Sequence, residues 1–158
     1  MIVRKAKRTD CDEIVAHDLT LAEETEQWIP ELNTVTRGVQ KVLEENTYGF
    51  YLVVEEDGII IGQVFVTSEW SDWRNASIWW LHRIYIQKKW RSKGIFRLII
   101  DTLLDLAKDT DIFAIRLYVQ PTNMNAKEIY EHMGFSKTSF EIFNRSVEDQ
   151  LHNLNGRC

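Results

Sequence analysis

The sequence predicts an α/β domain in which helices flank a mixed β-sheet, and two observations support this. Segments rich in β-branched and aromatic residues alternate with amphipathic helical segments in the order β-α-α-β-β-β-α-β-α-β. The chain has 158 residues, 44% of them hydrophobic, and contains no linker, internal repeat or low-complexity stretch. We therefore expect residues 1–158 to form a single domain around one core.

Each expected element rests on a local pattern. The strands are rich in β-branched and aromatic side chains, and are expected at residues 2–6, 48–55, 59–68, 77–87, 114–119 and 135–143. The helices show apolar residues three or four positions apart, and are expected at residues 10–19, 34–45, 95–107 and 123–133. Thr9 or Asp10 can cap the first helix, and Gly134 suits the end of the last. Asp57-Gly58 predicts a tight hairpin turn, and a short helix is expected after Ser146.

Composition argues against several classes of function. The formal net charge of −5 is unlike the basic footprint of a protein that binds nucleic acid. Cys11 and Cys158 are the only two cysteines, and their spacing matches neither a disulfide framework nor a zinc site, so no metal ligands are expected. No signal-peptide pattern and no long apolar run is present. We expect a cytoplasmic protein without membrane contact.

One segment combines a strand, a basic turn with glycine and the start of a helix, at residues 84–96. Such a turn directs backbone N–H groups and the positive end of the helix dipole toward one point, where a pyrophosphate fits. Gly94 lets the backbone approach phosphate oxygens closely, and the turn adds the basic side chains Lys88, Lys89, Arg91 and Lys93. An ordinary solvated turn explains the same pattern equally well. The segment matches neither G-x-x-x-x-G-K-[ST] nor G-x-G-x-x-G.

A second segment, at residues 123–135, opens a helix with Asn123 and carries Tyr130 two turns later. Asn123 is a natural helix cap and Tyr130 an ordinary core aromatic. Alternatively, Asn123 hydrogen-bonds an amide of a ligand and the Tyr130 phenol donates a proton.

Together the two segments resemble the GNAT superfamily of acyl-CoA-dependent N-acyltransferases. Its phosphate-binding signature is (Arg or Gln)-x-x-Gly-x-(Gly or Ala), which residues 91–96 meet except that Phe96 replaces the small last residue. Its later signature is met by Asn123, Ala126, Tyr130, Glu131, Gly134 and Phe135. The order of elements agrees with the family's from residue 2 to about residue 143.

The resemblance implies the fold of that family and acetyl-CoA as co-substrate. The cofactor is then expected between the strands at 77–87 and 114–119, with its pyrophosphate on the basic turn. The cofactor-binding residues implied are Ile84, Tyr85, Ile86, Arg91, Ser92, Lys93, Gly94, Ile95, Phe96, Asn123 and Tyr130.

The activity implied is acetyl transfer by direct attack of an amine on the thioester. Tyr130 matches the position of the general acid in many relatives. The glutamate that often serves as base is replaced, and His82 is the candidate because its ordinary pKa suits a base at neutral pH. His82 is expected to share one strand face with Ile84 and Ile86. A packing role for His82 remains open, as does a water chain ending on Glu23, Glu24 or Asp72.

The acceptor is expected to be a primary amine of a small molecule or peptide, and composition does not choose among amines. Five tryptophans are candidates for an aromatic wall around a cationic amine, or are in part ordinary core residues: Trp28, Trp70, Trp73, Trp79 and Trp80. Two other functions stay open, a catalytically inactive acyl-CoA-binding regulatory module and a purely structural domain. The oligomeric state stays open, and a homodimer in which residues 135–143 form the contact rests on analogy alone.

Overall fold

The computed structural model describes residues 1–25 and 28–147 of the chain. These fall into two compact units, residues 1–124 and residues from 125 onward. The first unit contains the following helices and strands: β1 (Ile2–Lys5), α1 (Cys11–Thr25), α2 (Leu32–Glu44), β2 (Phe50–Glu56), β3 (Ile59–Ser71), β4 (Ala76–Ile86), α3 (Ile95–Ala107) and β5 (Ile112–Leu117). The second contains all but the first residue of α4 (Met124–His132) and the segment that follows it. No helix among the described residues is long and apolar enough to cross a membrane.

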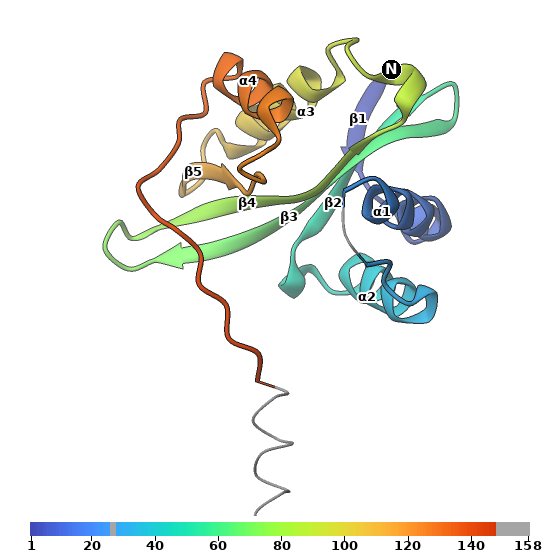
Figure 1. Ribbon diagram of the computed structural model, residues 1–158, viewed down its shortest axis with the longest axis horizontal. Helices are drawn as coiled ribbons and strands as arrows, with labels where there is room; N and C mark the ends of the chain where they lie inside the picture. The colour runs from blue at the N-terminus through green and yellow to red at the C-terminus, as the bar shows by residue number, and fades with distance from the viewer. Residues whose placement is uncertain (26–27, 148–158) are drawn as a thin grey trace, which may run out of the picture. The chain divides into compact units, whose positions relative to one another are not determined.

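The first unit is built on a mixed five-stranded sheet in the order β1-β2-β3-β4-β5. The first three pairings are antiparallel, and β4 pairs with β5 in parallel. Asp57 and Gly58 form the turn between β2 and β3, with φ of 51° and 77°, so the predicted hairpin is confirmed. Helices α1 and α2 cover one face of the sheet and α3 covers the other (Figure 1). The predicted α/β fold with a mixed central sheet is therefore confirmed.

Each face of the sheet buries an apolar helix surface. Beneath α1 and α2 the buried cluster consists of Cys11, Ile14, Val15, Val35, Val39, Tyr51, Val53 and Ile60. Beneath α3 the buried helix residues are Ile95, Ile99, Ile100 and Leu103. The spacing of three to four residues in each helix places these side chains on one face, as the sequence pattern predicts.

An extra residue in β4 changes which side chains share a face. Gln63 on β3 opposes Tyr85, but Phe65 opposes His82, so Arg83 and Ile84 together face the single residue between Gln63 and Phe65. His82 and Tyr85 consequently lie on the same face. The prediction that Ile84 and Ile86 share the face of His82 is wrong, because a period of two fails across a bulge.

The last expected strand, at residues 135–143, is not formed in the described chain. Gly134 adopts the predicted left-handed conformation after α4, with φ of 86°. The segment beyond it makes no strand pairing, and the side chains of Phe140, Ile142 and Phe143 are exposed. Composition favours a strand here, but a strand also needs a paired neighbour. The helix expected after Ser146 falls almost wholly on residues outside the described ranges.

Gly49, which precedes β2, occupies a position that excludes any side chain. Its φ is 122°, and a Cβ there would lie 2.1 Å from the carbonyl oxygen of Val66. We expect Gly49→Ala to lower the free energy of unfolding by about 3 kcal/mol in urea denaturation, because strain and overlap combine. Gly58→Ala is the matched control, since its φ is also positive but no atom lies within 4 Å of the added Cβ. A loss at Gly49 no larger than the roughly 1 kcal/mol expected at Gly58 would contradict this packing.

Candidate functional site

The candidate site begins where β4 and β5 part. Their parallel pairing ends at Leu81 and Leu117, whereas β4 continues to Ile86. Beyond that point, residues 82–86 pair with β3 on one edge but have no described strand on the other. An extended ligand that carries amides can add to such an edge by pairing with its N–H and C=O groups.

The same strand leads into the start of α3. A short 3₁₀ turn, Lys88–Trp90, follows β4, and α3 begins at Ile95. Ser92 and Gly94 both adopt left-handed conformations, with φ of 62° and 78°. The first N–H groups of a helix have no acceptor within the helix, and the dipole adds positive potential there. No heavy atom lies within 4 Å of a Cβ built on Gly94, so the space in front of the helix is open. An anionic pyrophosphate suits this place.

The basic side chains of the turn are partly committed to partners within the protein. The Arg91 guanidinium donates to a Glu24 carboxylate oxygen at 2.6 Å and to the carbonyl oxygen of Ile86 at 2.9 Å. Lys88 lies 3.6 Å from the same carboxylate, and Lys93 lies over the Trp90 ring. Glu24 therefore ties the turn to the end of α1. The backbone of the turn, more than the Arg91 charge, is left to face a phosphate.

His82 stands at the opening between the two strands. It directly follows Leu81, the last β4 residue paired with β5, and its Nε2 lies 2.9 Å from the Thr67 hydroxyl. Burial, aided by the charge of Arg83, lowers the pKa of His82 below its ordinary value. The ring is therefore neutral at neutral pH, as a general base must be.

Two aromatic residues beside His82 extend this surface. Tyr118 directly follows Leu117, the last paired residue of β5, and its ring lies 6.1 Å from that of His82 and 4.6 Å from that of Trp80. The sequence reasoning missed Tyr118, because it placed this residue inside a strand. Nothing in the chain's pattern indicates where β5 stops pairing.

The five tryptophans do not form one wall. Trp79 and Trp80 are adjacent in β4 and point to opposite faces of the sheet, with Trp79 packed edge-on against Phe50. Trp73 lies in the turn between β3 and β4 and is 90% exposed. Trp80 stacks on Tyr118 beside His82.

The remaining candidates are the general acid, the predicted helix cap and two of the alternative bases. Asn123 directly precedes α4, where a cap is expected. Tyr130 lies on α4 in the second unit, where burial raises the pKa of its phenol and its ring meets Phe135 edge-on. Among the alternative bases, Glu24 is paired with Arg91 and Lys88. The Asp72 carboxylate accepts a hydrogen bond from the Trp73 backbone.

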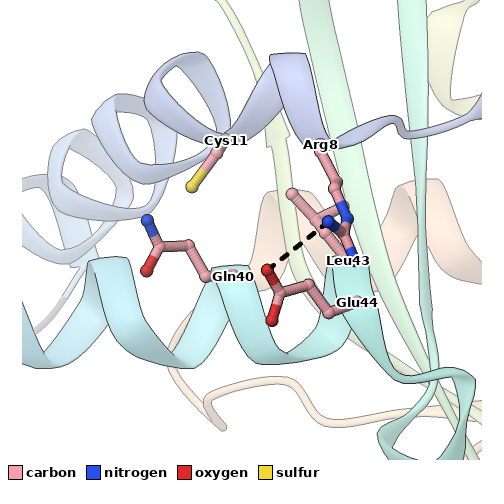
Figure 2. Close-up of a pocket in the computed structure, with 5 residues that line it drawn as sticks. All are labelled: Arg8, Cys11, Gln40, Leu43 and Glu44. Carbon is pink, nitrogen blue, oxygen red and sulfur yellow. Dashed lines mark ion pairs between the residues drawn. The ribbon is translucent and has the colours of Figure 1, made fainter.

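A pocket between α1 and α2 is unrelated to this opening. It is lined by Arg8, Cys11, Gln40, Leu43 and Glu44, and Figure 2 shows these side chains between the facing helices. It lies at the opposite end of α1 from Glu24. The described residues also contain no group of histidine, cysteine or acidic side chains arranged to hold a metal ion.

A buried carboxylate on α1, that of Asp18, lies close to Arg83, the residue that follows His82. The sequence pattern did not indicate it. Asp18 on α1 is 3% exposed and accepts hydrogen bonds from Gln63 at 2.8 Å and from the Tyr51 hydroxyl at 3.4 Å. The Arg83 guanidinium lies 3.5 Å away. Burial raises the pKa of Asp18 to about 6, against the opposing effect of Arg83.

Comparison with known proteins identifies the family. The model of the acetyltransferase (GNAT) family matches residues 10–135. The chain therefore belongs to the GNAT family. This GNAT protein is an acetyltransferase, and the acyl donor of such enzymes is acetyl-CoA.

Individual relatives of this GNAT protein agree. A thialysine N-epsilon-acetyltransferase from Bos taurus is 26% identical over 85% of this chain and 83% of the bovine protein. The crystal structure of a possible acetyltransferase from Clostridium difficile 630 is 33% identical, with a TM-score of 0.86 over 92% of this chain and 97% of that one. A predicted acetyltransferase from Clostridium acetobutylicum, solved with acetyl-CoA, shares the fold at 21% identity, with a TM-score of 0.74 over 93% of this chain and 97% of that one.

The raised pKa of Asp18 makes stability depend on pH. The folded carboxyl holds its proton more tightly than the unfolded one, whose ordinary pKa is 3.8. Wild type should therefore gain stability relative to Asp18→Asn as the pH falls through about 6, and lose it as the pH rises. We expect a relative gain of about 1 kcal/mol between about pH 7 and pH 5, measured by urea denaturation. Comparing the two proteins removes most of the contribution of groups common to both, including His17, Tyr51 and Arg83. A difference that does not change over this range would contradict the assignment.

Proposed function

We propose that this protein transfers the acetyl group of acetyl-CoA to the primary amine of a small molecule or peptide by direct attack. The observation that carries the proposal is that β4 continues beyond its last residue paired with β5, and that a short turn then joins it to the start of α3. The end of β4 thus offers the pantetheine arm an edge that no described strand pairs, and the start of α3 offers a place for the pyrophosphate.

The residues present fit this co-substrate. The edge formed by Ile84, Tyr85 and Ile86 can pair with amides, and the N–H groups at the start of α3, around Gly94, suit a phosphate. Asn123 is assigned to the thioester end because it matches the family's later signature. Holding the thioester beside the amine supplies much of the rate, since it removes the entropy cost of encounter.

Two side chains are assigned to proton transfer. Neutral His82 accepts the amine proton as the new N–C bond forms, and the C–S bond breaks. Tyr130 donates its phenol proton to the departing sulfur, and solvent later restores both groups. His82 is supported by its place at the opening and its lowered pKa. Tyr130 is supported by its match to the family signature.

The acceptor class follows from the same surface. Trp80 and Tyr118 present stacked rings beside His82, and Glu69 on β3 accepts a hydrogen bond from the Trp80 indole. Aromatic rings with a nearby carboxylate suit a cation, and Arg116 already lies 5.6 Å from the centre of the Trp80 ring and 3.9 Å from Glu69. The ring of Tyr118, which is 52% exposed, is therefore the part of this surface assigned to a cationic amine. The name of the bovine relative makes thialysine and lysine the first amines to assay.

Binding of acetyl-CoA is tested by thermal unfolding of wild type and Gly94→Trp. At a ligand concentration of about 100 times Kd, we expect wild type to gain roughly 2.7 kcal/mol, which raises Tm by several degrees. Gly94→Trp should lose this shift, because the indole fills the open space before α3. Gly58→Trp is the matched control, a left-handed glycine with equally open space in the hairpin turn, and it should keep the shift. No shift in wild type would refute the proposal, and a shift without acetylation of any amine would favour the inactive binding module.

The role of His82 is tested by the pH dependence of kcat/KM. We expect His82→Gln to lower kcat/KM by roughly 100-fold, since it removes the base but keeps the size of the side chain. The wild-type profile should also contain an acid limb below pH 6.5, the ordinary pKa of histidine, that is absent from the variant. Thr67→Val is a useful comparison, because it removes only the hydroxyl that lies 2.9 Å from His82 Nε2. An unchanged rate in His82→Gln would exclude His82 and return attention to a water-linked carboxylate.

A further inference from the structure

Asp18 is a buried charge that the proposed reaction does not use. It lies in the middle of α1, among positions that face the sheet, and only 3% of it is exposed. Burying a carboxylate is costly unless polar partners compensate. A buried carboxylate at this position of α1 therefore points to a role other than filling space, and its polar partners indicate which role.

Three neighbouring strands each supply one partner to this carboxylate. Gln63 on β3 donates to Oδ1, Tyr51 on β2 donates to Oδ2, and Arg83 on β4 places a guanidinium nitrogen 3.5 Å from Oδ2. The helix is thereby fixed to β2, β3 and β4 at one point.

The orientation of Gln63 is itself fixed by a second layer. Its Oε1 lies 3.1 Å from Nδ1 of His17, and the other nitrogen of that ring lies 3.3 Å from the Gln87 amide. Gln87 Nε2 also donates to the carbonyl oxygen of Ile60 and so serves as a donor toward the ring. His17 must then be neutral with its proton on Nδ1, which leaves the Gln63 amide nitrogen to donate to Asp18 and to the carbonyl oxygen of Ile14.

The partner on β4 is the residue that forms the bulge. Arg83 has a φ of 51°, a left-handed conformation that is strained for a residue with a side chain. It directly follows His82 and lies just past the point where β4 leaves β5. Half of the Arg83 side chain is exposed, yet its charged end reaches a carboxylate whose side chain is 1% exposed. The ion pair thus acts on the strained residue itself.

We propose that Asp18 is a positioning residue, whose carboxylate holds Arg83 in the left-handed conformation and thereby sets the direction of His82 at the opening. The catalytic part of this inference rests on the proposed function, because only an active His82 makes its direction matter to rate. The geometric part does not, since the bulge exists without substrate.

Asp18→Asn and Arg83→Gly test the inference. We expect Asp18→Asn to lower kcat about tenfold or more at a temperature where the variant is fully folded, with a much smaller change in KM. In Arg83→Gly, glycine adopts the bulge conformation without needing the ion pair to Asp18. Adding Asp18→Asn to this variant should therefore change kcat less than about twofold. Asp101→Asn, at an exposed carboxylate on α3, is the control and should leave kcat unchanged. Equal losses of kcat in both backgrounds, or stability loss with unchanged kcat, would overturn the proposal.

A second readout separates this inference from the proposed function. The NMR signals of the His82 ring should move in Asp18→Asn and stay in place in Asp101→Asn, with His132 on α4 as an internal reference. If the His82 signals do not move, the Asp18–Arg83 ion pair does not set the direction of His82, whatever the activity. If the signals move but wild type acetylates no amine, the positioning role of Asp18 is supported and the proposed function fails.

Discussion

The bulge in β4 is the constraint on which the site depends. On one edge, β4 pairs with β3 along its whole length, from Ala76 opposite Ser71 to Ile86 opposite Gly62. On the other edge, its pairing with β5 ends at Leu81. One extra residue, held in a left-handed conformation, shifts the register of β4 against β3 just past Leu81, where the pairing with β5 ends. The shift places His82 and Tyr85 on the same face of the sheet, at the point where β4 continues without β5 toward α3.

Electrostatics around the opening is divided between backbone and side chains. The basic turn contributes less free charge than its sequence indicates, because Glu24 accepts from Arg91 and lies near Lys88. The proposed binding through N–H groups and a helix dipole depends on conformation, and Ser92 and Gly94 have the positive φ values that such a turn needs. The Arg91–Glu24 pair then fixes the turn against α1.

Much of the fold was predictable from the sequence, because its signals are local. Asp57-Gly58 gave the hairpin, and helical spacing gave α1, α2 and α3. The predictions that failed depend on partners distant in the chain. Residues 135–143 have strand composition but no pairing neighbour in the part of the chain that the structure describes. Ile84 and Ile86 change face at a bulge that no sequence pattern marks. Asp18 looks like an ordinary polar helix residue until three strands surround it. The strand, turn and helix start around Gly94 agree with the sequence pattern, and phosphate binding by this turn stays a prediction.

The central claim is that the edge of β4 beyond Leu81 and the start of α3 bind acetyl-CoA together. Amide hydrogen exchange, measured by mass spectrometry with and without acetyl-CoA, tests it most directly, because exchange reports where backbone N–H groups gain partners. We predict slower exchange in residues 82–86 and 92–97, and little change in α2. Protection confined to other segments, or protection of the turn without β4, would contradict the account.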